Sequence, residues 1–328
     1  MFIDNNWYGN RNILSKYCRV KDQPILGSLQ HGLLLATHFD ITKANAAKLG
    51  ERKFYQIPWL VWNDYIVENT KINKIKNIIN IGSPMIYLHE MIKNKKFSKP
   101  NGILVIPCRS VYEVSHIVDY DKLIRMIKKK FKPPYKILVG YFDLDKIFNI
   151  RHKYKDCTFV TCGKRRDLNY TYRLYRYLRE CQTTVNFYPG TSILYSLFFK
   201  KKTYYINNRY LIKTSKALMA FTNNKLFTTK SNKSKYNSKV SVKISEIMED
   251  DKISAECFKI EYGIDLFKLN KKIHYKKALV ALGYNKKKSP KELREILGWN
   301  SIFKKILAQL LSKLVSLRHK NLGKINRY

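Results

Sequence analysis

The chain has 328 residues, with 64 Lys and Arg against 24 Asp and Glu, so its formal net charge is +40. A hydrophobic content of 45% is enough to build packed cores and excludes a disordered chain. The charge favours nucleic acid, anionic membrane or phosphorylated substrates as partners. A gene composition biased towards Lys, Asn, Ile and Tyr would explain the same excess, so charge alone does not select a function.

The six cysteines stand at positions 18, 108, 157, 162, 181 and 257, form no Cys-x-x-Cys pair and indicate a reducing compartment. The N-terminus has no basic region followed by an apolar run, and no apolar stretch is long enough to cross a bilayer. We therefore expect a cytoplasmic protein, with peripheral attachment to the inner face of the cytoplasmic membrane as an open alternative.

The first part of the chain alternates apolar runs with helix-compatible segments. Runs at 24–32, 57–63 and 76–84 each end near Gly, Pro or Asn and predict three strands. Strands separated by helices indicate a parallel sheet. Residues 93–101 are polar, charged and contain Pro, which predicts a linker and sets a first domain at 1–95.

The same pattern restarts beyond the linker. Apolar runs predict strands at 102–107, 136–141, 158–163, 184–188 and 203–206. Helices are expected at 121–131, 169–181 and 193–199, and Ser289-Pro290-Lys291-Glu292 predicts a further helix start. This alternation is typical of a doubly wound α/β sheet, so a second domain is predicted at 96–300.

Residues 301–328 predict a basic amphipathic helix. Its apolar residues from Ile302 to Leu317 follow helical spacing, and most of the Lys residues lie off that stripe. Such a helix can lie in an anionic membrane interface or dock on the core of its own protein, and the spacing does not separate the two.

The strongest local signal for a site is Gly190, Thr191 and Ser192, where a strand turns into an apolar helix. Exposed N–H groups at a helix N-terminus suit a pyrophosphate, although Thr and Ser are also ordinary helix caps. Arg109 and Ser110 follow the strand at 102–107, where an Arg can bind phosphate, or can be a plain surface residue.

Two further candidates also follow strands. Gly163, Lys164 and Arg165 open a run of cations that could neutralise a diphosphate leaving group, and a solvated charge run is the alternative interpretation. His31, between Gln30 and Gly32, is a candidate base for taking a proton from an acceptor hydroxyl. The rival bases are Asp40, Asp64 and Glu68. No residues stand at metal-binding spacing, so neither a metal nor another cofactor is expected.

Several of these residues belong to short motifs that occur together in a characteristic order. The motifs are Gly27-Ser28-Leu29-Gln30-His31-Gly32, Val61-Trp62-Asn63, Asn80-Ile81-Gly82-Ser83-Pro84-Met85-Ile86-Tyr87-Leu88, Val105-Ile106-Pro107-Cys108-Arg109-Ser110, Val160-Thr161-Cys162-Gly163 and Gly190-Thr191. In these motifs the chain resembles the bacterial surface-polysaccharide glycosyltransferases of the GT-B type, found in capsule and O-antigen (lipopolysaccharide) biosynthesis. The resemblance covers residues 10 to 210 and, weakly, 289 to 299.

The resemblance implies two Rossmann-like domains facing across a cleft and a metal-independent transfer of sugar from a nucleotide-sugar to a glycan or lipid-linked glycan. The acceptor side would be lined by Gln30, Gly32, Trp62 and Asn63, and the donor phosphates would lie at Gly190, Thr191 and Ser192. Similar proteins often carry His where this chain has Arg109, which places use of a CMP-sugar in doubt.

Two other functions remain open. A polyol-phosphate transferase or a sugar epimerase could use the same scaffold, because fold does not fix chemistry. A basic nucleic-acid-binding protein would also suit the charge and the 24 Tyr, although no known binding motif is present.

Overall fold

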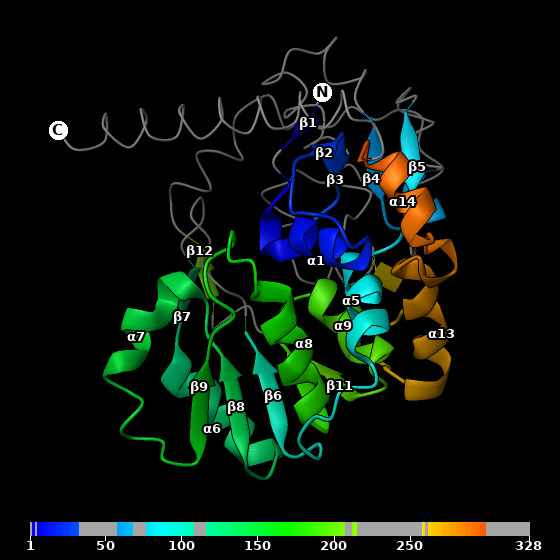
Figure 1. Ribbon diagram of the computed structural model, residues 1–328. Helices are drawn as coiled ribbons and strands as arrows, with labels where there is room; N and C mark the ends of the chain where they lie inside the picture. The colour runs from blue at the N-terminus through cyan, green and yellow to red at the C-terminus, as the bar shows by residue number, and fades with distance from the viewer. Residues whose placement is uncertain are drawn as a thin grey trace, which may run out of the picture.

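The computed structural model of the chain describes residues 2–3, 5–32, 58–67, 77–107, 116–206, 212–214, 258–259 and 262–299. Within them the protein is α/β, with two parallel sheets as its main elements. The sheets lie towards opposite ends of the molecule, and helices α1, α5, α8 and α9 lie between them (Figure 1). The expectation of an α/β fold with parallel sheets is therefore confirmed.

The larger sheet has five strands, all paired in parallel. They are β6 (Ile103–Ile106), β8 (Tyr135–Leu138), β9 (Cys157–Val160), β10 (Thr183–Asn186) and β11 (Lys202–Tyr205). Their order across the sheet is β9-β8-β6-β10-β11, so the chain winds outwards from β6 in one direction and then from β10 in the other. This is the doubly wound order, and its switch point lies between β6 and β10.

Helices cover both faces of this sheet because successive side chains on a strand point to opposite sides. Ile103 and Val105 of β6 pack with α6 (Tyr120–Lys130) and α7 (Leu144–Phe148). Leu104 and Ile106 pack in the other core, with α5 (Pro84–Ile92), α8 (Tyr170–Glu180) and α9 (Thr191–Phe198). The predicted strands and helices of this half are confirmed to within a few residues.

The smaller sheet has three parallel strands in the order β3 (Ser28–Leu29), β4 (Trp59–Val61) and β5 (Ile78–Asn80). Two antiparallel pairs complete the described strands, β1 (Phe2–Ile3) with β2 (Ile25–Leu26) and β7 (His116–Val118) with β12 (Ile212–Thr214). The strand expected at 24–32 is divided at Gly27, whose φ of +100° ends β2. The short helix η1 (Trp7–Gly9) leads into α1 (Asn10–Tyr17).

The C-terminal part of the described chain returns to the smaller sheet. Helix α13 (Lys271–Ala281) packs against α9, and helix η6 (Tyr284–Lys286) and helix α14 (Pro290–Ile296) follow it towards the smaller sheet. The capping box predicted at Ser289 is present. The Asn63 Nδ2 donates to the Ala281 carbonyl at 2.6 Å, and the Ser83 N–H donates to the Leu282 carbonyl at 2.8 Å. Residues 281–299 thus pack with the first half, whereas α13 packs on α9 and residues 266–269 lie along β11 in the second half.

One hydrophobic core joins the two halves. It contains Leu14 and Met85 from the first half, Leu104 and Leu194 from the second, and Leu293 from the returning segment. The predicted boundary at residue 95 therefore marks a change of sheet within one continuous core. None of the helices in the described part of the chain has the length and apolar composition that a bilayer crossing demands. The amphipathic helix expected at 301–328 lies outside the described residues.

Candidate functional site

The switch point of the larger sheet places the end of β10 beside the end of β6. Ligands in open α/β sheets collect at this position, beyond the carboxyl ends of the strands. After β10 the chain turns at Gly190, and α9 begins at Thr191 without a side-chain cap. Gly190, Thr191 and Ser192 are partly exposed, so the first turn of α9 is accessible to solvent.

A turn from the smaller sheet lies against this helix start. A Cβ placed on Gly32 would lie 3.6 Å from the Thr191 Oγ1. Gln30 fixes the shape of the turn, because its Nε2 donates to the Gly32 carbonyl at 2.8 Å and its Oε1 accepts the Trp62 N–H at 2.9 Å. The turns predicted for the acceptor side and the donor side are therefore neighbours in space.

Trp62 and Asn63 lie behind this surface and not on it. Both are buried, and the Trp62 indole N–H donates to the Gln30 carbonyl at 3.0 Å. The Asn63 Oδ1 accepts the Ile66 N–H, and its Nδ2 bonds Ala281. Their expected place lining a cleft is corrected: their polar groups are used inside the protein, and they support the turn at Gln30.

The loop after β9 brings a cation to the same place. The Arg165 guanidinium lies 4.0 Å from the centre of the Trp7 ring, and its Nη2 lies 3.2 Å from the His31 Nε2. Arg166 lies 5.3 Å from the same Trp7 ring. Stacking on an aromatic face holds a guanidinium while leaving its edge able to bind an anion.

Gly163 and Lys164 have different roles in that loop. Gly163 has a φ of +92°, and a Cβ there would meet the carboxylate of Asp167 and the guanidinium of Arg173, which form an ion pair at 2.7 Å. Gly163 is thus needed for the loop conformation. Lys164 is exposed, with its Nζ 4.9 Å from the centre of the Tyr141 ring.

His31 is neutral near pH 7 in this arrangement. It retains an exposed surface, yet desolvation by the surrounding protein and the positive charge of Arg165 lower its pKa to about 4. A guanidinium can only donate hydrogen bonds, so the His31 Nε2 accepts from Arg165 and the ring proton resides on Nδ1. Because its pKa is low and its Nε2 lone pair is engaged, His31 is a weak base in this state.

Asn186 lies at the same edge of the larger sheet, in the protein interior. It ends β10, is fully buried, and its Oδ1 and Nδ2 find no hydrogen-bond partner in the structure as far as it is described. The register sets it beside Ile106 and Tyr205, on the face covered by α8 and α9. A buried amide without partners costs about 1–3 kcal/mol, and such groups often occur where a ligand or water completes the bonding.

Asp64, the one rival base among the described residues, is engaged by partners that are not part of this site. The Asp64 carboxylate pairs with the Lys286 Nζ at 2.8 Å and accepts from the Asn80 Nδ2 at 2.9 Å. Burial alone would raise the pKa of Asp64, but hydrogen bonds from Lys286 and Asn80 outweigh burial and lower it, which makes it a weak base. Asp40, Glu68, Arg109 and Ser110 lie outside the described residues. Within the described ranges no three metal-ligating side chains gather.

Trp7, Tyr8 and Asn186 contribute to the site without having been identified as site residues. Trp7 and Tyr8 lie 5.8 and 6.1 Å from the His31 ring, centre to centre. The sequence carries no local signal for this, because the contact joins η1 to two distant loops. Asn186 was detectable in principle, since a polar residue ending a buried strand is unusual.

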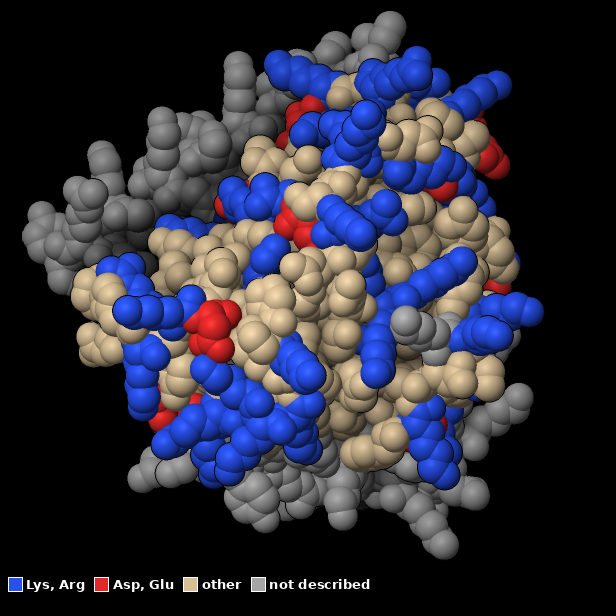
Figure 2. Space-filling view, turned by 90° about the horizontal axis from the view of Figure 1, so that it is seen from below, with Lys and Arg blue, Asp and Glu red and all other residues tan. Residues whose placement is uncertain are grey.

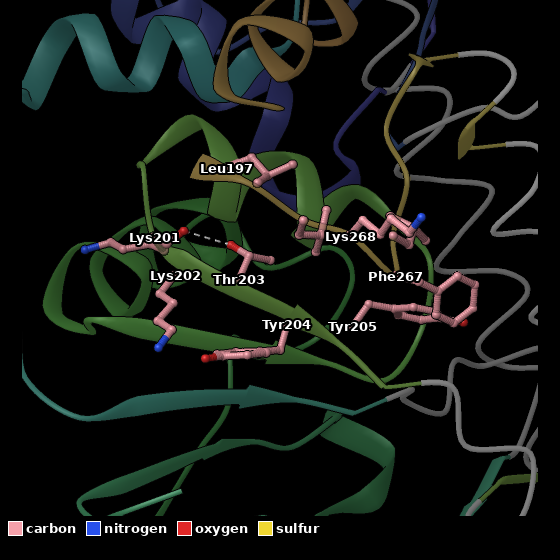
Figure 3. Close-up of a pocket in the computed structure, with 10 residues that line it drawn as sticks. Leu197, Lys201, Lys202, Thr203, Tyr204, Tyr205, Phe267 and Lys268 are labelled. Atoms are coloured by element: carbon pink, nitrogen blue, oxygen red, sulfur yellow. Dashed lines mark hydrogen bonds between the residues drawn. The ribbon is translucent and has the colours of Figure 1, made fainter. Parts of the chain in front are cut away.

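A separate pocket of about 340 Å³ lies along β11, the edge strand of the larger sheet (Figure 3). Its lining comes from β11 and the end of α9 on one side and from residues 266–269 on the other. The rings of Tyr205 and Phe267 lie 5.5 Å apart at one end of it. None of the predicted site residues that the structure describes lines this pocket, so it is distinct from the candidate site.

Lys and Arg are not confined to one part of the molecular surface (Figure 2). Seen from below, the molecule carries Lys and Arg over most of its face, with few acidic groups among them (Figure 2). The candidate site is defined by the stacking and hydrogen bonding of Arg165 and by the start of α9, and not by charge density.

The fold and the site define a class, an α/β protein with a doubly wound parallel sheet and a candidate anion site at its switch point. No family model matches the chain, and no curated protein or solved structure matches it either.

Proposed function

We propose that the chain is a glycosyltransferase that moves a sugar from a nucleotide-sugar donor to a glycan or lipid-linked glycan. One observation carries the proposal: the start of α9 at Thr191, the Arg165 guanidinium and the His31–Gly32 turn converge on one accessible edge. A helix N-terminus and a guanidinium together suit a diphosphate. The facing turn from the smaller sheet is the natural place for an acceptor.

In this proposal the two parallel sheets have the roles of the two halves of a GT-B enzyme. The larger sheet would bind the donor at its switch point, and the smaller sheet would present the acceptor. Arg165 and the first turn of α9 would stabilise the charge that develops on the departing nucleotide. Asn186 would complete its amide bonding with the donor or with a water that the donor orders.

His31 would gain basicity only when the donor is bound. The Arg165 guanidinium occupies the His31 Nε2 and lowers its pKa. A bound diphosphate would draw Arg165 to itself and offset its charge, so the Nε2 lone pair would be released and the pKa of His31 would rise. The imidazole could then accept the proton of the attacking hydroxyl, which couples acceptor activation to donor binding.

The first test is a thermal-shift screen with CMP, UDP and GDP and their sugar conjugates, because a ligand of the native state raises apparent stability. We expect one nucleotide series to give a shift and Gly190→Val to abolish it. Gly190 has an extended φ of −158°, which other residues adopt. A Cβ there would lie 3.3 Å from Cδ1 of the Tyr188 ring, so the larger Val side chain should displace that ring beside the start of α9. Gly190→Ala, with its smaller side chain, is the matched variant for the fold.

The second test is release of free nucleotide from the donor that binds. A sugar epimerase would change the sugar and leave the nucleotide attached, whereas a transferase requires an acceptor and frees the nucleotide. If every conjugate fails to shift the wild type, or if Gly190→Val retains a full shift, the donor site lies elsewhere and the proposal fails.

A further inference from the structure

The connection between β8 and β9 exposes an unusual group of apolar side chains. Tyr141 and Phe142 belong to the short helix η3 (Tyr141–Asp143), and Leu144 and Phe148 belong to α7. Phe148 is 60% exposed and Phe142 is 47% exposed. The other large apolar residues exposed in the described part of the chain are Leu168, Phe267, Ile273, Val280 and Tyr284. We refer to Tyr141, Phe142, Leu144 and Phe148 as the α7 patch.

Cations surround the α7 patch. The Lys164 Nζ lies 4.9 Å from the centre of the Tyr141 ring, and the Arg151 guanidinium lies 4.5 Å from that of Phe148. Within the patch Asp145 is exposed, whereas Asp143 is fully buried and pairs with Lys146 at 2.6 Å. Exposed aromatic rings bordered by Lys and Arg match the chemistry of an anionic bilayer surface, where rings enter the interface and cations meet headgroups.

We infer that the α7 patch is a membrane-contact surface that inserts into bilayers containing anionic phospholipid. A protein partner fits less well, because a stable protein interface covers about 800 Å² on each side, and four side chains on two short helices offer much less. Insertion into a bilayer needs no matching partner surface. It uses the protruding rings, and the surrounding cations add attraction to the headgroups.

The position of the patch relates it to the candidate site. Helix α7 lies at the outer end of the larger sheet, away from α13 (Figure 1). Lys164 contacts the patch and directly precedes Arg165, so both features lie on the carboxyl edge of the sheet. Bilayer contact would hold the candidate site near lipid-linked glycans, and this consequence alone rests on the proposed function.

The test is co-flotation of the full chain with phosphatidylcholine vesicles that contain roughly 30% phosphatidylglycerol. The double variant Phe142→Ser/Phe148→Ser is compared with Val280→Ser, a control 63% exposed on α13. All three proteins carry the same charge, so general electrostatic adhesion is equal. We expect the double variant to lose roughly tenfold or more in vesicle affinity and the control to bind as wild type does.

A second readout does not depend on the double variant. Phe148→Trp places an indole in the patch, and its emission should move to shorter wavelength and be quenched by brominated lipid. Leu310→Ser/Leu314→Ser tests the amphipathic sequence at 301–328 as the rival membrane anchor. Unchanged vesicle binding by the patch variant, or an indole that brominated lipid does not reach, would overturn the inference. The inference would also be overturned if the patch variant only converted a dimer into monomers. No nucleotide is involved, so the outcome is independent of the proposed transfer reaction.

Discussion

The guanidinium of Arg165 lies against the ring of Trp7, 4.0 Å from its centre, and so ties the loop after β9 to the N-terminal segment. This contact positions the cation that the proposed donor needs. Trp7→Ala should leave Arg165 present but poorly oriented, and we expect nucleotide affinity to fall by about 1–2 kcal/mol, measured by calorimetry. Tyr284→Ala, which removes an exposed ring elsewhere, should leave the affinity unchanged. Equal affinities for wild type and Trp7→Ala would show that stacking does not organise the site.

Removal of the cation itself should have a larger effect. Arg165→Ala deletes a charge-assisted bond to phosphate, worth about 1.5–3 kcal/mol, so we expect Kd to rise roughly tenfold to hundredfold. Lys129→Ala is the control, because Lys129 is an exposed cation on α6, on the opposite face of the sheet. If both variants weaken binding alike, the donor responds to overall charge and not to Arg165.

The pKa of His31 provides a direct test of its coupling to Arg165. We expect the imidazole resonances of His31, assigned by their loss in His31→Gln, to titrate near pH 4 in wild type and to move towards the ordinary value of about 6.5 in Arg165→Ala. Nucleotide binding should raise the pKa in the same direction. Binding would therefore take up a proton, and affinity should increase as the pH falls from about 6.5 towards 4.

The stability of the free protein should change with pH in the direction opposite to that of the nucleotide affinity. The folded pKa of His31 lies below its unfolded value, so below about pH 6.5 the unfolded chain binds more protons. The contribution of His31 to stability should then be present above that pH and decline as the pH falls towards 4. Urea unfolding of wild type and His31→Gln across this window measures it. A difference between the two proteins that stays constant with pH would contradict the assigned pKa.

Substitution of Asn186 should increase the stability of the protein and decrease its affinity for nucleotide. Asn186→Leu replaces an amide without partners by an apolar group of similar size, so we expect the free energy of unfolding to rise by about 1 kcal/mol and nucleotide affinity to fall. Asn63→Leu is the contrasting variant, because both polar atoms of that buried amide are bonded, and it should lose about 2–3 kcal/mol. Similar losses in both variants would mean that Asn186 is a structural residue.

A substitution at Gly283 tests the close contact between the C-terminal segment and Trp62 in the first half. Its φ is +68°, and a Cβ there would overlap the Trp62 carbonyl oxygen. Gly283→Ala should therefore destabilise the protein by about 2–5 kcal/mol, the sum of left-handed strain and overpacking. Gly190→Ala, at an extended position, should change the unfolding midpoint little. A mild effect at Gly283 would argue against the close contact with Trp62.

The larger sheet could be predicted from the sequence because each of its strands is a short apolar run and each helix has an apolar stripe. The run at Ile103–Ile106 and the stripe of Leu123, Ile124 and Ile127 are local features, and local features determine both elements. The smaller sheet was harder to predict, because Gly27 divides one strand where its backbone closely approaches Pro58.

The sequence allowed the proximity of residues that follow strands to be predicted, but not the inward packing of Trp62 and Asn63. Arg165, Thr191 and Gly32 follow strands, and the parallel arrangement brings such positions to one edge. Trp62 and Asn63 also follow a strand, yet they turn inwards to bond Gln30 and Ala281. Nothing in the local sequence distinguishes those two outcomes, since the bonding partners lie far along the chain.

The packing of residues 281–299 against the first half has a consequence for synthesis. A ribosome completes Leu60 and Met85 long before it reaches Leu293, yet these side chains share one core. The nascent first half must therefore wait, with apolar surface uncovered, until residues 281–299 have emerged. Translation products that end before this segment would keep that apolar surface exposed and be prone to aggregation and degradation.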